Sequence, residues 1–162
     1  MSNLIKKIMV YVDGTEQSVT AAQYAICLAC STDAEMFAHY VINTKAVEDL
    51  LKAKIFLQDE QVDYEHDMEA DAERYLNYID DLARQKGLPI AKKRSKGTIH
   101  QEIVNAVKEE NIDLLVLGEL SRIRSRRDEF YDEAERALRT APCSVLIVKD
   151  EDRVWNIYDS LV

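Results

Sequence analysis

Several features that would place a protein in or across a membrane are missing from this 162-residue sequence. Its longest apolar runs fall well short of the roughly 20 residues that a membrane-spanning helix needs. Residues 1–3 lead directly into an expected strand, without an apolar leader or a cleavage site. Only three cysteines are present, Cys27, Cys30 and Cys143, and their spacings build no disulfide framework. We therefore expect a cytoplasmic protein with no membrane association.

Basic residues are also scarce relative to acidic ones. The sequence has 21 Lys and Arg residues against 30 Asp and Glu residues, a formal net charge of −9, which disfavours general binding to nucleic acid or anionic membranes. The charge is unevenly spread, because residues 59–83 hold ten acids and one base, whereas residues 84–96 hold six bases and no acid. This pattern predicts two solvated surfaces that meet at a helix end, with a basic docking patch as the alternative.

Short apolar runs alternate with amphipathic stretches along the chain. The expected strands cover residues 8–13, 36–42, 89–96, 113–118 and 144–148, and the basic, proline-containing third one is typical of a sheet edge. The expected helices begin at Ser18, at Gln61, at a capping box formed by Thr98 and Gln101, and at Glu133. Residues 44–60 are ambiguous, with one helical piece around residues 46–57.

This alternation predicts a doubly wound α/β fold. Its open parallel five-stranded sheet has helices on both faces, and the expected strand order is 3-2-1-4-5. We expect one α/β domain over residues 1–149, followed by a helical tail over residues 150–162. Ligands of such sheets bind beyond the carboxyl ends of the strands, where the strand order reverses. The expected order places Asp13 and Gly118 side by side at that edge.

From residue 8 to residue 148 the sequence resembles the universal stress protein family. The stretches that carry the resemblance are residues 10–18, the pair Gly97-Thr98, residues 113–118 and residues 134–148. ATP-binding members of this family carry a G-x2-G-x9-G-[ST] loop after the fourth strand. In this sequence Gly118 matches the first glycine, but Ser121, Tyr131 and Asp132 stand at the other three positions.

The resemblance implies a nucleotide pocket at Asp13, Val41, Gly118, Ser121, Tyr131 and Asp132. Asp13 would contact the adenosine part of a nucleotide, although an Asp before Gly at a strand end is equally suited to forming a turn. Tyr131 obstructs the close approach of backbone N–H groups to phosphate. The neighbouring acids Asp128, Glu129, Asp132 and Glu133 would repel a triphosphate. Opposing this, Arg122, Arg124, Arg126 and Arg127 could bind phosphate instead.

We therefore expect a non-catalytic stress-response regulatory protein without a cofactor. The alternative is an adenine-nucleotide-binding stress protein that takes ATP with Mg²⁺ through Asp13, Gly118 and the loop arginines. Hydrolase, P-loop and dinucleotide-binding signatures are missing from the sequence. The pair Cys27 and Cys30 falls inside a helix, where packing is its expected role. His39, His66 and His100 lie in separate elements, without the spacing of metal ligands.

The last expected strand and the tail that follows it both suggest contacts with other protein chains. The last strand, Ser144 to Val148, would leave a hydrophobic sheet edge, and family members commonly pair this strand across a dimer, so we expect a homodimer. The tail carries Val154, Tyr158 and Leu161 at helical spacing, beside the only tryptophan, Trp155. It is expected to pack on its own subunit or on its dimer mate, with binding to a regulatory protein partner or disorder as alternatives.

Overall fold

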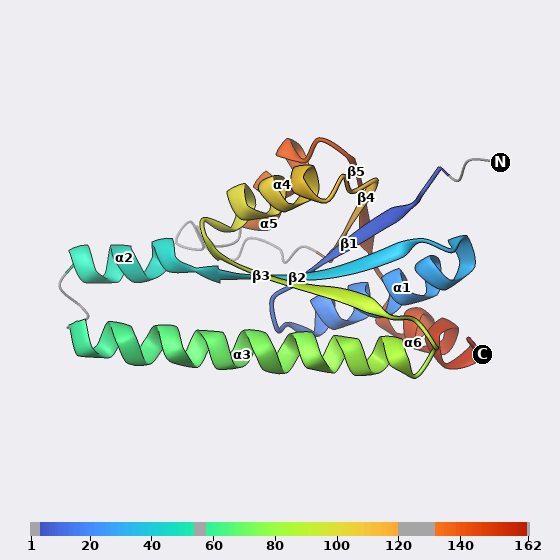
Figure 1. Cartoon of the computed structure of the whole chain (residues 1–162), viewed down its shortest axis with the longest axis horizontal. Coiled ribbons are helices and arrows are strands. Elements are labelled where there is room, and N and C mark those ends of the chain that lie inside the picture. The colour runs from blue at the N-terminus through green and yellow to red at the C-terminus, as the bar shows by residue number, and fades with distance from the viewer. Residues whose placement is uncertain (1–3, 54–57, 120–131, 162) are drawn as a thin grey trace.

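The computed structural model describes residues 4–53, 58–119 and 132–161 (Figure 1). Its centre is a parallel sheet of five strands in the order β3-β2-β1-β4-β5. The strands are β1 (Lys7–Val12), β2 (Glu35–Asn43), β3 (Ile90–Gly97), β4 (Leu114–Gly118) and β5 (Ser144–Val148). The predicted α/β fold and strand order are confirmed, and the basic third strand does lie at a sheet edge.

Helices cover both faces of the sheet. They are α1 (Glu16–Thr32), α2 (Thr44–Lys52), α3 (Gln58–Arg84), α4 (Ile99–Glu109), α5 (Asp132–Thr140) and α6 (Glu151–Ser160). One hydrophobic core joins the sheet to α1, α3 and α6, and includes Ile26, Ile79 and Val154. A second core joins the opposite face to α4 and α5, and includes Ile103 and Ala137. The chain is therefore built in three layers, with the sheet in the middle.

Strand β1 shows why the apolar runs form the centre of the sheet. Ile8, Val10 and Val12 enter the first core, whereas Met9 and Tyr11 enter the second. Side chains alternate between the two faces of a strand, so a strand that is covered on both faces must be apolar throughout. Each such side chain that is fully buried contributes about 1.5–3 kcal/mol of transfer free energy.

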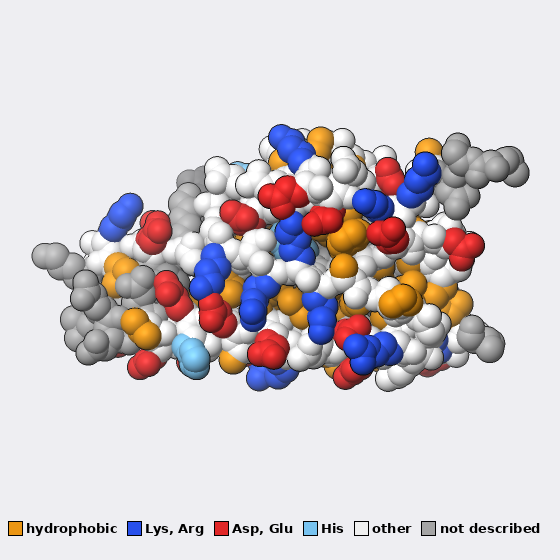
Figure 2. Space-filling model, viewed as in Figure 1, with side chains coloured by type: hydrophobic (Ala, Val, Ile, Leu, Met, Phe, Trp, Pro, Cys, Tyr) orange, Lys and Arg blue, Asp and Glu red, His pale blue; other side chains and the backbone are white. Residues whose placement is uncertain are grey.

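The basic run lies on edge strand β3 and is paired with acids from both neighbouring layers. Lys92 lies 3.6 Å from Asp80 of α3, and Lys93 lies 2.7 Å from Glu109 of α4. Lys96 pairs with Glu69 of α3. Figure 2 shows Lys and Arg side chains gathered over β3, with Asp and Glu side chains on either side. This arrangement favours the interpretation of the charge runs as solvated surfaces over that of a basic docking patch.

The boundaries of α1, α2 and α3 differ from those predicted. Helix α1 is capped by Thr15 and not by Ser18, because the Thr15 hydroxyl oxygen accepts a hydrogen bond from the Ser18 backbone N–H at 3.2 Å. The Ser18 hydroxyl instead donates to the Thr15 carbonyl oxygen at 2.9 Å. In the ambiguous stretch, α2 begins directly after β2, at Thr44, and ends at Lys52, and α3 begins at Gln58, three residues before the predicted start.

The C-terminal tail forms α6 and packs against its own subunit. Val154 is 0% exposed and Tyr158 is 3% exposed, because both belong to the core shared with α1 and α3. The Tyr158 hydroxyl donates a hydrogen bond of 2.6 Å to the carbonyl oxygen of Leu82, near the end of α3. The Lys86 ammonium group lies 4.6 Å from the centroid of the Tyr158 ring and donates to the Leu161 carbonyl oxygen. These contacts tie the tail to the end of α3.

Candidate functional site

The candidate site lies at the carboxyl ends of the central strands. Strands β1 and β4 pair in parallel, so Asp13, which follows β1, and Gly118, which ends β4, reach the same edge of the sheet. Val41 lies on β2, on the other side of β1, and is buried in the second core. Asp132 begins α5, although its side chain lies outside the described residues, as do Ser121 and Tyr131.

Asp13 forms a tight turn between β1 and α1. Its Oδ1 atom accepts hydrogen bonds from the Thr15 backbone N–H at 3.0 Å and from the Thr15 hydroxyl at 2.6 Å. Gly14 follows with a φ of +85°, which favours glycine. These bonds hold Thr15 in the position from which it caps α1. Asp13 therefore has the turn-forming role considered from the sequence, while its contact with a ligand stays a prediction.

Gly118 is required by packing within the protein. A Cβ atom at this position would lie 2.6 Å from the backbone carbonyl carbon and oxygen of Gln17, in the first turn of α1. Such a contact is too short for real atoms, so any larger residue would push α1 away from β4. Gly118, the only glycine of the family motif that this sequence keeps, is therefore explained by packing without a phosphate ligand.

Glu133, in the first turn of α5, joins this helix to α4. Its Oε2 atom accepts a hydrogen bond of 3.0 Å from the His100 backbone N–H, and it lies 2.7 Å from His100 Nδ1. Burial raises the pKa of the Glu133 carboxyl, but the backbone and ring hydrogen bonds from His100 and the charge of Arg136 outweigh burial and hold the pKa below its usual value. Glu133 is therefore ionised at neutral pH.

One prediction at the start of α4 is wrong. Thr98 occupies the N-cap position of α4 but makes no side-chain capping hydrogen bond, so the predicted capping box with Gln101 does not form. The Glu133 carboxylate satisfies a backbone N–H at the start of α4 instead. The local sequence carries no signal for this pairing, because the two residues are 33 positions apart.

Two carboxylates influence Tyr11, whose side chain is buried near the end of β1. Burial raises the pKa of the Tyr11 hydroxyl most strongly, and the charge of Asp13, the neighbouring Tyr40 phenol and the charge of Glu133 raise it further. Asp13 and Glu133 therefore both contribute negative potential near the carboxyl end of β1, which disfavours a phosphate group there.

The cysteine pair of α1 and the histidine of β2 lie in packed surroundings. Burial raises the pKa of both Cys27 and Cys30, which suits packing in α1 better than thiolate chemistry. Buried His39 bonds through Nε2 to the Ser95 hydroxyl at 2.7 Å. Within residues 4–53, 58–119 and 132–161, no group of three or more His, Cys, Asp or Glu side chains is placed to hold a metal ion.

Comparison with known proteins identifies the family. The model of the universal stress protein family matches residues 4–149, which is most of the chain and includes every strand of the sheet. The chain belongs to the universal stress protein family. A universal stress protein of Methanocaldococcus jannaschii is 31% identical over 147 residues, which cover 91% of this chain and 84% of the relative.

Two solved structures of universal stress proteins have the same fold. A family member from Burkholderia pseudomallei has a TM-score of 0.69 and is 21% identical, with 93% of this chain and 100% of that chain covered. A member from Arabidopsis thaliana, solved with AMP bound, has a TM-score of 0.62 and is 16% identical, with 91% and 94% covered. Helix α6 lies beyond the region that the family model matches.

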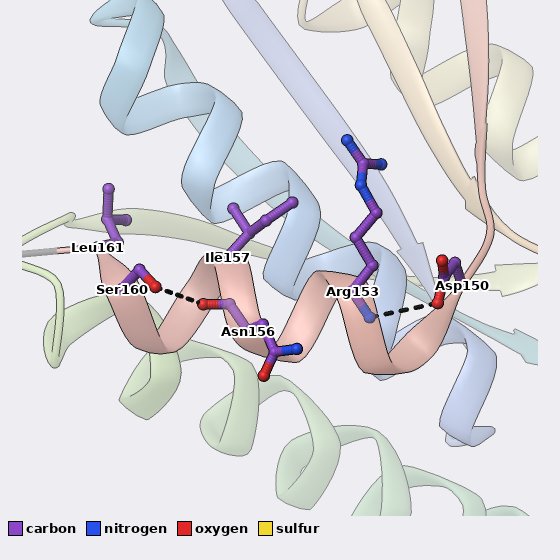
Figure 3. Close-up of a pocket in the computed structure, with 6 residues that line it drawn as sticks. All are labelled: Asp150, Arg153, Asn156, Ile157, Ser160 and Leu161. Atoms are coloured by element: carbon purple, nitrogen blue, oxygen red, sulfur yellow. Dashed lines mark hydrogen bonds between the residues drawn. The ribbon is translucent and has the colours of Figure 1, made fainter.

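A second surface feature lies along α6. An open hollow of about 600 Å³ is lined by Asp150, Arg153, Asn156, Ile157, Ser160 and Leu161, and Figure 3 shows the side chains of Arg153, Ile157 and Leu161 along one side of the helix. The centre of the Trp155 ring lies 6.3 Å from that of the Tyr158 ring, and binding of a partner by this tail stays a prediction. Among the helices of the described residues, none is long and apolar enough to cross a membrane.

Proposed function

We propose that this universal stress protein is a non-catalytic, cytoplasmic regulator of the stress response whose crevice does not hold a triphosphate. The observation that carries this proposal is the ionised Glu133 carboxylate at the first turn of α5, held in place by His100. In ATP-binding members of the family, the loop before this helix would hold phosphate. A fixed negative charge at that helix end disfavours a phosphate ligand.

Two further observations support the proposal. Asp13 already accepts two hydrogen bonds from Thr15, so it serves the turn without a ligand. Gly118 faces the backbone of Gln17, so its small size is used in packing α1 against β4. Neither residue needs a nucleotide to explain its presence.

The alternative function is binding of an adenine nucleotide, with ATP and Mg²⁺ as the ligands. It is favoured by the AMP found in the Arabidopsis thaliana structure and by the position of Asp13 at the edge where such sheets bind ligands. In this case Asp13 and Gly118, with the arginines of residues 120–131, would hold the nucleotide.

Isothermal titration with Mg-ATP and AMP separates the two functions. We expect no saturable heat up to millimolar Mg-ATP for the unmodified protein, which corresponds to binding weaker than about 4 kcal/mol. Glu133→Gln should allow measurable binding if its charge is the obstacle, whereas the control Glu135→Gln, on the same helix, should not. Micromolar Mg-ATP binding that is lost in Asp13→Ala would show that the alternative is right.

Homodimer formation through β5 is a separate proposal. Strand β5 lies at an edge of the sheet, and edge strands carry unpaired backbone groups that a second copy could pair. Sedimentation velocity should give a dimer for the unmodified protein and a monomer for Ile147→Lys, which places a charge on the edge strand. Ile157→Lys on α6 is the control and should remain dimeric. If it also becomes monomeric, the tail contributes to the dimer, and a monomeric unmodified protein would exclude the dimer.

The remaining proposal about protein contacts is that the tail around Trp155 binds a regulatory partner. The exposed hollow on α6 supports it, because Ile157 and Leu161 present apolar side chains beside charged ones. Ile157→Lys, which leaves the buried Val154 and Tyr158 unchanged, should weaken the binding of any co-purifying protein. Unchanged co-purification with this variant would argue against a role for the hollow.

A further inference from the structure

One side of helix α6 carries a cation followed by two apolar side chains. Arg153, Ile157 and Leu161 follow one another at intervals of four residues, and Figure 3 shows their side chains along the same side of the helix. All three line the open hollow of about 600 Å³. Because a helix rises by about 1.5 Å per residue, this row of side chains is about 12 Å long.

The packing of α6 leaves the apolar part of this row partly uncovered. Val154 and Tyr158, on the inner side of the helix, are buried in the core shared with α1 and α3. Ile157, by contrast, is 36% exposed, and Leu161 is only partly buried where it packs against that core. The folded chain therefore leaves apolar surface open to a ligand at both positions.

The guanidinium group of Arg153 has no partner among residues 4–53, 58–119 and 132–161. The backbone N–H of Arg153 donates a hydrogen bond of 3.2 Å to Asp150 Oδ1, which caps α6, but its side chain makes no hydrogen bond or ion pair with a described residue. Figure 3 shows the guanidinium group extending away from the Asp150 carboxylate. Four other arginines are each paired with an acid, namely Arg74, Arg84, Arg136 and Arg139.

The free guanidinium group calls for an anion, and its surroundings favour one with a single charge. The planar fork of arginine donates two parallel hydrogen bonds to a carboxylate or a phosphate. The first turn of α6 holds Glu151 and Asp152, and the whole chain has a net charge of −9. These charges repel a doubly charged phosphate more strongly than a carboxylate. The apolar row beside Arg153 further favours a carboxylate that carries an alkyl chain.

From this arrangement we propose that the hollow on α6 binds a fatty acid of medium chain length. The carboxylate pairs with the guanidinium group of Arg153, and the alkyl chain lies along Ile157 and Leu161. Helix α6 lies beyond the region that the family model matches, so this site is separate from the crevice of the family fold. Fatty-acid binding goes beyond the proposed function, because it requires neither a nucleotide in the crevice nor a protein partner on the tail.

Decanoate is a suitable probe, and decyltrimethylammonium is its counterpart with the same chain length and a positive head group. Both are titrated into the full chain at constant ionic strength and below the concentrations at which they form micelles. Binding is followed by calorimetry and by the fluorescence of Trp155, the only tryptophan. We expect saturable binding of decanoate with a dissociation constant on the order of 1 mM, and at least fivefold weaker binding of the ammonium compound. Butyrate, which lacks most of the chain, should not saturate the site.

Two matched pairs of variants separate the head-group contact from the chain contact. Arg153→Gln should weaken decanoate binding about tenfold, as the loss of a charge-assisted pair predicts, whereas Arg139→Gln removes the same charge from α5 and should have no effect. Ile157→Ser should weaken binding about fivefold. Val62→Ser, which changes an exposed apolar residue of α3, should leave it unchanged. All four side chains are exposed, so circular dichroism should show that the fold is kept.

Three results would overturn the proposal. They are equal binding of decanoate and the ammonium compound, equal losses in Arg153→Gln and Arg139→Gln, and no saturation by decanoate below its micelle concentration. Equal losses in Ile157→Ser and Val62→Ser would show a general attraction of alkyl chains to exposed apolar groups, and this outcome also counts against a specific site. The Mg-ATP titration and the co-purification test use other ligands, so failure of either does not decide this proposal.

Discussion

Acidification should destabilise this protein through one buried histidine. His39, in the middle of β2, is fully buried and bonds through Nε2 to Ser95 of β3. Burial lowers its pKa from 6.5 to about 4, and the positive charge of Lys93 adds to this effect, while Glu109 opposes it. The folded protein therefore keeps His39 neutral at a pH where the unfolded chain has already bound a proton.

The sign and size of the effect follow from the two pKa values. The unfolded chain binds more protons between pH 6.5 and pH 4, so stability is complete above pH 6.5 and falls as the pH is lowered towards 4. The full loss is about 3 kcal/mol, and about 2 kcal/mol of it is present at pH 5. The pKa values of Glu109 and Glu133 are lowered in the folded protein. Their contributions to stability are therefore lost only below pH 4.5, which is the ordinary pKa of a glutamate.

Urea denaturation measures this effect. The free energy of unfolding is determined at pH 7, 6 and 5 for the unmodified protein and for His39→Gln, with circular dichroism and Trp155 fluorescence as probes. Glutamine can still bond to Ser95 but does not titrate. The unmodified protein should lose about 2 kcal/mol more than the variant between pH 7 and pH 5. Parallel losses in the two proteins would show that His39 is not the group responsible.

Three substitutions test local contacts by the same urea assay. Tyr158→Phe removes the hydrogen bond to Leu82 and should cost about 1 kcal/mol; no change would mean that α6 is held by apolar packing alone. Gly118→Ala should cost about 1–3 kcal/mol because its methyl group meets the Gln17 backbone, and a neutral result would contradict this close approach. Thr15→Ala should cost about 1 kcal/mol as the cap of α1 is lost, whereas Thr140→Ala, at the exposed end of α5, should cost less.

The sequence predicted the sheet well because its central strands leave little choice. The runs that became β1 and β4 are apolar on both faces, and such segments fit only the middle of a parallel sheet. The run of lysines that became β3 belongs at an edge, where one side of the strand is open. Right-handed crossovers allow the predicted strand order but do not by themselves select it over other doubly wound orders.

Capping and the site were harder to predict because they depend on contacts between distant residues. Thr15 and Ser18 are both good capping residues, and the turn formed by Asp13 decides between them. Glu133 caps α4 from another helix, which no local pattern indicates. The stacking of the Tyr40 and Tyr75 rings is not predictable from the sequence for the same reason, since the two residues meet only after α3 packs on the sheet.

The position of α6 after the last strand affects how the protein folds during synthesis. Val154 and Tyr158 complete the core between α1 and α3, yet they follow all five strands in the chain. Until they emerge from the ribosome, the apolar surface around Ile26 and Leu82 stays open to solvent or to chaperones. A ribosome that stops between β5 and α6 would release a chain with all five strands but with one side of this core uncovered.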